Sequence, residues 1–331
     1  MKAIVLKNAH ELVVEEAPEP QIGPDEALVK VAACGICGTD LHLYKHGSLS
    51  PNVRMGHESA GTIVEVGKQI EGFRIGDRVA ILGRIPCGQC HWCRRGRHHI
   101  CPTRLDVRGG FSEYVAAKEG MLARIPDNLT FKQAAVVEAM AVSLHGVRLA
   151  QIGKGDGVVV TGAGPIGLFA AALLRDIGVR KLVISEPSNR RRETASRWAD
   201  RVVNPVEEDL AEIAREALDP CVDALVECSG QPRVLEDAFN IVGFAGRVLL
   251  LAACLENINV NPALLLVREI RFETSYGCDM EEFRHCIELV RSGRVDVDPI
   301  ISRAVSQAEL PEAFERLCGP NDDVKIVMDI P

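Results

Sequence analysis

The chain has 331 residues, more than twice the usual length of one domain, so we expect two domains. Hydrophobic residues make up 47% and charged residues 25%, a balance that excludes disordered and fibrous proteins. The net charge of −8 and the aromatic content of 4% argue against nucleic acid or an anionic membrane as the main partner. Neither a signal peptide nor a membrane-spanning run is recognisable. We therefore expect a soluble, cytoplasmic protein.

Residues 1 to about 130 have the pattern of β-structure. Short alternating or β-branched runs are separated by turns rich in Gly, Pro and Asp, and these runs are Ala3–Leu6, Glu11–Val14, Glu26–Val31, Ser59–Val66 and Arg78–Ile81. From about Asp127 the spacing of the hydrophobic residues changes, and Leu129–Leu149 has a helical pattern interrupted by polar turns.

From Lys154 onward, strands alternate with helices. The predicted strands are Val158–Thr161, Lys181–Ser185, Asp223–Glu227, Arg247–Ala252 and one near Ile270–Glu273, and the predicted helices include Ile166–Ile177 and Asn189–Asp200. This alternation predicts a doubly wound parallel sheet. The C-terminal segment does not show this alternation, and we expect its elements at Glu281–Ser292, Ile300–Val305, Gln307–Leu317 and Val324–Asp329. We expect one domain from residues 1–149 and 277–331, and a second from residues 150–276.

A glycine turn opens the second predicted domain. Gly162, Gly164 and Gly167 form a G-x-G-x-x-G element, with Pro165 and Ile166 inside it, directly after a predicted strand and before a helix. In that context the element predicts a dinucleotide site, because the helix N-terminus faces the pyrophosphate. A glycine-tolerant turn without a ligand is the alternative.

The end of the next predicted strand concerns the choice between NAD and NADP. Glu186 is placed to bind the adenosine ribose hydroxyls and to repel a 2′-phosphate, which favours NAD. Arg190, Arg191 and Arg192 follow in the next helix and could attract that phosphate, so NADP is the alternative. These arginines could equally form a solvated helix face, with one guanidinium, such as that of Arg191, over the adenine.

Six of the twelve cysteines are scattered, and four others form a tight group. Cys87, Cys90, Cys93 and Cys101 lie within a turn-rich segment, residues 86–102, that has little core in which to bury thiols. Four thiolates at this spacing predict a closed, structural zinc site. An iron–sulfur cluster also uses four thiolates, but its usual spacings differ.

A second candidate metal set lies around Cys37, His57 and Glu58. Glu138 adds a carboxylate in an otherwise apolar helical stretch, where it needs a metal or a cation as partner. Three protein ligands and an open position are what a catalytic zinc requires. Buried Cys and His side chains without a metal are the alternative.

Together these motifs resemble the zinc-containing medium-chain alcohol dehydrogenase superfamily over essentially the whole chain. The matched segments are Cys37–Asp40, Gly56–Glu58, the four-cysteine segment, Gly162–Gly167 and Glu138. Within that superfamily the chain is most similar to the sorbitol (polyol) and butanediol dehydrogenases, through Glu138 and Ser185–Ser188. The resemblance implies an α/β fold, with a β-rich GroES-like catalytic domain and a Rossmann domain.

The resemblance also implies roles for individual residues. Cys37 and His57 hold the catalytic zinc together with Glu58, in which case Glu138 binds the zinc-bound water, or together with Glu138 as the direct ligand. Asp40 orients His57. Thr39 accepts the alcohol proton, and His42 passes it to solvent, although His42 could be an ordinary surface histidine. We expect two Zn²⁺ per chain, a small-molecule alcohol substrate, and a homodimer or homotetramer.

The chain departs from its relatives in two places. Glu138 is followed by Ala139 and Met140 instead of Pro and Leu, and the connection from Cys101 to Gly110 is short. The short connection predicts an open substrate pocket, which Tyr44, Lys45 and His46 could line. The leading hypothesis is an NAD-dependent polyol, diol or cyclitol dehydrogenase. The alternatives are a threonine-type amino-alcohol dehydrogenase and a non-catalytic dinucleotide-binding protein.

Overall fold

The computed structural model describes residues 1–48, 50, 52–107 and 109–330, which form two compact units. The first unit comprises Met1–Ala139, Asp279–Gly293 and Ile301–Pro331, and the second comprises Met140–Cys278 and Arg294–Ile300. The division falls inside helix α3 (Val137–Leu149), upstream of the boundary expected at residue 149. The segment 294–300 belongs to the second unit, where Arg294 pairs with Asp176 at 2.7 Å.

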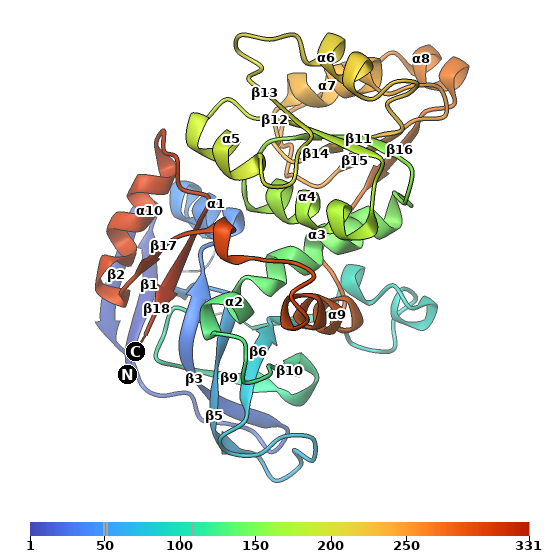
Figure 1. Ribbon diagram of the computed structural model, residues 1–331. Coiled ribbons are helices and arrows are strands. Elements are labelled where there is room, and N and C mark those ends of the chain that lie inside the picture. Colours follow the sequence, from blue (N-terminus) through green and yellow to red (C-terminus); the bar gives the residue numbers. More distant parts are fainter. Residues whose placement is uncertain (49, 51, 108, 331) are drawn as a thin grey trace. The chain divides into compact units, whose positions relative to one another are not determined.

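The first unit is built around a seven-stranded sheet. Its order is β10 (Leu122–Arg124), β6 (Arg78–Leu82), β5 (Glu58–Val66), β3 (Glu26–Gly35), β18 (Lys325–Asp329) and β17 (Ile301–Val305), and β9 (Tyr114–Lys118) also pairs with β3. Val327 of β18 lies opposite Gly35 of β3 in an antiparallel pair. The end of the chain therefore joins the sheet that its beginning forms, and Figure 1 shows red β18 beside blue β3.

Two small sheets and a mixed core complete the first unit. Strands β1 (Lys2–Asn8), β2 (Glu11–Glu16) and β4 (Val53–Arg54) form one sheet, and β7 (Arg84–Ile85) pairs with β8 (Leu105–Asp106) in the other. Ile4, Val29, Ile63, Phe111 and Phe314 are among the buried side chains of the core. Helices α9 (Met280–Arg291) and α10 (Leu310–Cys318) also belong to this unit.

One helix interrupts the N-terminal region for which the sequence predicted only β-structure. Helix α1 (Gly38–His46) begins directly after Cys37, whose backbone N–H donates to Asp40 Oδ2 at 3.0 Å. The prediction was wrong here because a nine-residue helix with a weakly amphipathic sequence gives little periodic signal. Asp40, the third helical residue, accepts the N–H of the N-cap residue Cys37 in a capping box at the start of the helix.

Other element boundaries differ in smaller ways from the prediction. The stretch expected as one interrupted helix divides into α2 (Phe131–Ala135) and α3. Helix α5 (Asn189–Ala195) ends well before Asp200, because the backbone N–H of Asp200 donates to Leu182 O and the chain turns toward β13 (Arg201–Val203). Helix α10 starts at Leu310, after a short 3₁₀ turn at Gln307–Glu309.

The second unit is the doubly wound parallel sheet that the alternation of elements predicted. Its strand order is β13, β12 (Lys181–Ser185), β11 (Gly157–Thr161), β14 (Ala224–Glu227), β15 (Arg247–Leu250) and β16 (Arg271–Thr274), all parallel. Figure 1 shows α6 (Leu210–Ala217) and α7 (Pro232–Ile241) on one face and α4 (Pro165–Ile177) on the other, and α8 (Pro262–Arg268) precedes β16. The chain adds β12 and β13 on one side of β11 and then returns to add β14, β15 and β16 on the other side. Sheets of this kind bind ligands at the point where the direction changes.

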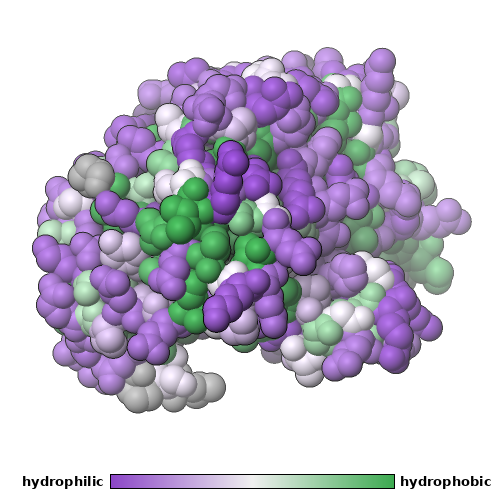
Figure 2. All heavy atoms as spheres, turned by 90° about the horizontal axis from the view of Figure 1, so that it is seen from below, coloured by the Kyte–Doolittle hydropathy of each residue, from purple (hydrophilic) through white to green (hydrophobic). Residues whose placement is uncertain are grey.

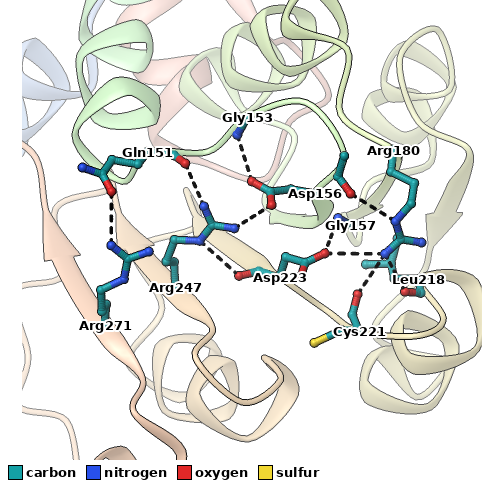
Figure 3. Close-up of polar contacts among 11 residues, drawn as sticks. Gln151, Gly153, Asp156, Gly157, Arg180, Leu218, Cys221, Asp223, Arg247 and Arg271 are labelled. Carbon is teal, nitrogen blue, oxygen red and sulfur yellow. Dashed lines mark hydrogen bonds and ion pairs between the residues drawn. The ribbon is translucent and has the colours of Figure 1, made fainter.

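A polar network joins the amino-terminal ends of these parallel strands (Figure 3). Arg247 pairs with Asp156 at 2.8 Å and donates to Gln151 O at 2.7 Å, while Arg180 donates to Leu218 O at 3.0 Å. Asp223 accepts the backbone N–H of Gly157 at 2.7 Å. These contacts fix the edge of the sheet opposite to the one where the glycine turn lies.

The face of the molecule drawn in Figure 2 is mostly hydrophilic, in keeping with the charged composition. Among the described residues, every helix is too short or too polar to cross a lipid bilayer.

Candidate functional site

The four predicted cysteine ligands lie together in the first unit. Cys87 Sγ is 4.0 Å from Cys93 Sγ, and Cys90 Sγ is 3.9 Å from Cys101 Sγ. A tetrahedral zinc with Zn–S bonds of ~2.3 Å places its sulfurs roughly 3.8 Å apart. These sulfurs therefore have the spacing of a zinc tetrathiolate and are too far apart for disulfides. We call residues 86–102 the cysteine lobe.

Hydrogen bonds in the cysteine lobe favour thiolates. The backbone N–H groups of Cys90 and Cys93 donate to the sulfurs of Cys87 and Cys90, each at 3.4 Å. The Thr103 hydroxyl and backbone N–H groups lower the pKa of Cys87 to about 6. Burial raises the pKa of Cys93 to about 12, so a metal that binds there must displace its proton.

The second metal set forms where α1 and β5 begin. Cys37 immediately precedes α1, His57 immediately precedes β5, and Glu58 is the first residue of β5. One ligand atom of each lies within 4.8 Å of the other two. Glu138, which the sequence offered as an alternative ligand, is not in this group within the part of the chain that the structure describes.

Asp40 lies behind this set, where the resemblance expected it. Its Oδ1 is 3.6 Å from His57 Nδ1, and its Oδ2 accepts the Cys37 N–H at 3.0 Å. Burial alone raises the pKa of Asp40, but His57 and the backbone N–H groups of Cys37 and Gly56 lower it below its usual value. The ionised carboxylate can therefore hold the His57 ring in one orientation, with Nε2 left to bind a metal.

Glu58 has a buried cation of its own. Lys325 Nζ donates to Glu58 Oε1 at 2.6 Å and to Ile36 O at 2.9 Å, and both side chains are essentially inaccessible. A Cβ on Gly35 would lie 2.2 Å from Glu58 Oε2, so only glycine leaves room for this carboxylate. Burial alone lowers the pKa of Lys325, but Glu58 and Cys37 raise it above its usual value. Lys325 therefore stays protonated.

The donor set fits a zinc ion. Among the described residues, Lys325 Nζ lies 2.6 Å from Glu58 Oε1 and 2.5 Å from Oε2, and the charge of Cys37 acts on the same ammonium group. Two acidic donors that share one buried cation leave room for the charge of a further cation. One thiolate, one imidazole and one carboxylate are ligand types that zinc accepts.

Glu138 lies near this set with an arginine beside it. Its side chain is 5% exposed, and its Oε1 lies 3.7 Å from Arg84 Nη2. The negative charge of Glu138 contributes to raising the pKa of Glu58, after the larger effect of burial. The two carboxylates therefore share one electrostatic environment, each with its own cation.

The predicted proton-transfer residues lie on α1. Thr39 and His42 are exposed, and the His42 ring centroid is 4.6 Å from that of His46. Tyr44, which the sequence offered as a substrate contact, is 2% exposed and its hydroxyl contacts Glu315 and His10 O. That expectation was wrong because Tyr44 packs into the core beside Phe314.

In the second unit, the glycine turn connects β11 to α4 and borders a cavity of about 760 Å³. Gly162 has a φ of +89°, and a Cβ on Gly167 would lie 1.9 Å from Gly162 O. Nothing lies within 4 Å of a Cβ built on Gly164, so the backbone there is open to a ligand. These features are those of a pyrophosphate-binding turn at a helix N-terminus, with Pro165 as the first helical residue and Ile166 as the next.

Glu186 lies at the wall of the same cavity. Its carboxylate accepts the backbone N–H groups of Ala163 at 2.7 Å and Ser188 at 2.9 Å, and the residue is 4% exposed. Arg191 lines the cavity too, whereas Arg192 donates to Glu186 O and Pro187 O. The acid is therefore fixed at the cavity and one arginine is near it.

Sequence reasoning missed Lys325 and Arg84. Lys325 was read as part of the closing strand, and Arg84 follows the predicted strand Arg78–Ile81. Neither carries a local motif, because each meets its carboxylate through tertiary structure, Lys325 across 267 residues. A lysine between the apolar residues Val324 and Ile326 was the one available signal.

Comparison with known proteins agrees with this arrangement. Residues 23–127 match the family model of the alcohol dehydrogenase GroES-like domain, and residues 165–292 match that of zinc-binding dehydrogenases. A sorbitol dehydrogenase of Bacillus subtilis is 32% identical, over 99% of this chain and 97% of that protein. An L-threonine 3-dehydrogenase of Pyrococcus abyssi is 36% identical, over 92% and 91%.

A solved structure gives the same result for the fold. A putative zinc-binding dehydrogenase from Sinorhizobium meliloti 1021, bound to NADP, superposes with a TM-score of 0.93 at 32% identity and covers 99% of both chains.

Proposed function

Because the chain belongs to the zinc-containing medium-chain alcohol dehydrogenase superfamily, we propose that it transfers hydride between NAD and a secondary alcohol, with a polyol, diol or cyclitol as substrate. The observation that carries the proposal is the group of Cys37, His57 and Glu58, whose ligand atoms lie within 4.8 Å of one another. Three protein ligands leave the fourth position of a tetrahedral zinc open, as a catalytic site requires.

Each candidate site residue of the first unit has its own role in the proposed reaction. Cys37, His57 and Glu58 would hold a zinc ion, which would supply Lewis acidity toward the alcohol. Asp40 holds the orientation of His57. Thr39 accepts the hydroxyl proton and His42, one turn further along α1 and exposed, passes it to solvent.

The second unit binds the dinucleotide. A bound NAD would supply the hydride acceptor or donor of the reaction. The open backbone at Gly164 receives the pyrophosphate, and Glu186 accepts hydrogen bonds from the ribose hydroxyls. The fixed carboxylate of Glu186 disfavours the 2′-phosphate of NADP, so we propose NAD as the preferred cofactor.

Exchange of Glu186 tests the cofactor preference. In Glu186→Ser, the ratio of kcat/KM for NAD to that for NADP should fall by roughly 10–100-fold, since the repulsion is lost and Arg191 remains. Glu193→Ser, on the exposed part of α5, is the matched control. A wild-type protein with higher kcat/KM for NADP would overturn the NAD preference.

A substrate panel read at the NADH absorbance tests the reaction. We expect 2,3-butanediol, sorbitol and inositol to be oxidised with higher kcat/KM than ethanol or 2-propanol, because the short connection after Cys101, which includes a residue outside the described ones, predicts an open pocket. Elemental analysis should give two zinc ions per chain. Protein that binds dinucleotide but turns over no alcohol would favour the non-catalytic alternative.

The threonine-type reaction is the second candidate. It is favoured by the 36% identity to the P. abyssi L-threonine 3-dehydrogenase, which is as close a relative as the sorbitol dehydrogenase. L-threonine therefore belongs in the panel, and a kcat/KM for it above every polyol would decide for this candidate.

A further inference from the structure

A buried carboxylate ends β14 in the second unit. Glu227, the last residue of that strand, is 0% exposed. Its Oε1 accepts the backbone N–H of Ser229 at 2.7 Å and that of Gly230 at 3.1 Å, and it also accepts the Ser229 hydroxyl. Burying a carboxylate is costly unless hydrogen bonds compensate it. Glu227 therefore fixes the turn that follows β14.

This turn packs against the glycine turn. A Cβ on Gly162 would lie 3.0 Å from the backbone nitrogen of Ser229, so the two backbones approach closely. On the β12 side of β11, the Glu186 carboxylate accepts the N–H of Ala163 at 2.7 Å. The start of the glycine turn is therefore contacted by Glu186 from the end of β12 and by Ser229 from beyond the end of β14.

The hydrogen of the Ser229 hydroxyl is already used. Glu227 Oε1 accepts two N–H groups, so the hydroxyl supplies the hydrogen of the contact between them. Ser229 Oγ also accepts the Gln231 N–H at 3.2 Å, and a hydroxyl oxygen has two lone pairs. Ser229 is half-buried and lines the same cavity of about 760 Å³ as Gly162 and Glu186. It can therefore offer a ligand one acceptor and no donor.

We propose that Ser229 accepts a hydrogen bond from a ribose hydroxyl of the bound dinucleotide, and that Glu227 is the positioning residue that keeps Ser229 an acceptor. Phosphate oxygens cannot donate to such a group, whereas ribose hydroxyls can. Ribose is the expected donor because Glu186, the other acceptor beside the glycine turn, is placed for ribose. This inference rests on the proposed function and specifies how its dinucleotide site recognises ribose.

Titration calorimetry with NAD and no alcohol tests the contact. Ser229→Ala removes one neutral hydrogen bond, so the affinity for NAD should fall by about 3–10-fold. In steady-state kinetics, KM for NAD should rise while kcat stays within about twofold of the wild type. Ser196→Ala is the matched control, since Ser196 is exposed and lies outside the cavity, and it should leave the affinity unchanged.

A double-mutant cycle tests the role of Glu227. Glu227→Gln keeps an acceptor oxygen and should bind NAD within about threefold of the wild type, whereas Glu227→Ala should weaken binding by about 3–10-fold. In the Ser229→Ala background, Glu227→Ala should add less than about twofold, because Glu227 acts through the Ser229 hydroxyl. Equal losses in both backgrounds would show that Glu227 only supports the fold of the turn.

Thermal unfolding checks that each variant is folded. Should Glu227→Ala be unfolded at the temperature of the titration, Glu227→Asp takes its place in the cycle. It withdraws the acceptor by one methylene and keeps the charge.

Three further probes identify the donor. ADP-ribose keeps two riboses without nicotinamide, and nicotinamide hypoxanthine dinucleotide keeps both riboses without the adenine amine. Ser229→Ala should weaken both as it weakens NAD, and loss of the effect with either probe would assign the contact to an amine or amide and overturn the inference. ADP has the adenosine ribose alone, so an effect on ADP assigns the contact to that ribose, and no effect assigns it to the other.

The outcomes separate this inference from the proposed function. If wild-type protein oxidises alcohols with NAD and Ser229→Ala binds NAD equally tightly, the inference is wrong and the function stands. If NAD binding depends on Ser229 but no alcohol is oxidised, the inference is supported and the proposed reaction fails. Wild-type protein that binds no dinucleotide would overturn both.

Discussion

The two candidate zinc centres of the first unit are built in opposite ways. The cysteine lobe takes four identical ligands from one short segment, and its own backbone N–H groups donate to the sulfurs. The second metal set, Cys37, His57 and Glu58, which we call the mixed centre, takes its ligands from the starts of α1 and β5. The cation beside Glu58 comes from β18, 267 residues away. A site with four protein ligands from one segment can stabilise a lobe. A site with three protein ligands from distant elements can leave its fourth position for substrate.

Removing a ligand from the mixed centre should have the largest effect. Cys37→Ser should lower kcat/KM by about 10³-fold or more, because Lewis-acid stabilisation is worth several kcal/mol and each ~1.4 kcal/mol is tenfold. Zinc content should fall from two ions to one per chain while the thermal unfolding midpoint stays close to that of the wild type. Steady-state kinetics, elemental analysis and calorimetry measure the three quantities.

Cys254→Ser is the matched control, since Cys254 lies outside both centres, and it should leave activity and zinc content unchanged. Retention of full activity by Cys37→Ser would remove the distinction between the two centres.

Replacing Lys325, the buried cation beside Glu58, should have the second largest effect. In metal-free protein, Lys325→Met leaves Glu58 buried without its ion pair, so the free energy of unfolding should fall by about 3–5 kcal/mol in urea denaturation. The double variant Lys325→Met/Glu58→Gln should recover most of that loss, because a neutral buried pair carries no uncompensated charge. A double variant no more stable than Lys325→Met would show that Lys325 acts by packing alone.

Loss of a lobe ligand should have a smaller effect, on stability more than on turnover. Cys90→Ser should lower the free energy of unfolding by roughly 3–4 kcal/mol, the linkage contribution of a metal present at 100–1,000 times its Kd. Limited proteolysis followed by mass spectrometry should find cleavage within residues 86–102, with kcat/KM lowered less than tenfold. If kcat/KM falls as far as in Cys37→Ser and the lobe resists cleavage, the lobe is not a separate structural site.

The sequence alone predicted the parts of this protein that are local. The spacing of the four cysteines predicted a lobe whose sulfurs do lie together. The glycine turn between a strand and a helix predicted the β11–α4 connection, because Gly162 and Gly167 meet within one turn and their backbone conformation follows from nearby residues. Alternation of elements was enough for the parallel sheet.

Tertiary structure decided the rest. The sequence offered both Glu58 and Glu138 as the acid beside Cys37 and His57, because neither spacing excludes the other, and only the fold places Glu58 within ligand distance of both among the described residues. Lys325 and Arg84 had no motif, since a buried cation is defined by the carboxylate that the fold places beside it. The short helix α1 was missed because its weakly amphipathic sequence gives little periodic signal, and its Asp40 is held by Gly56 and His57 as well as by Cys37.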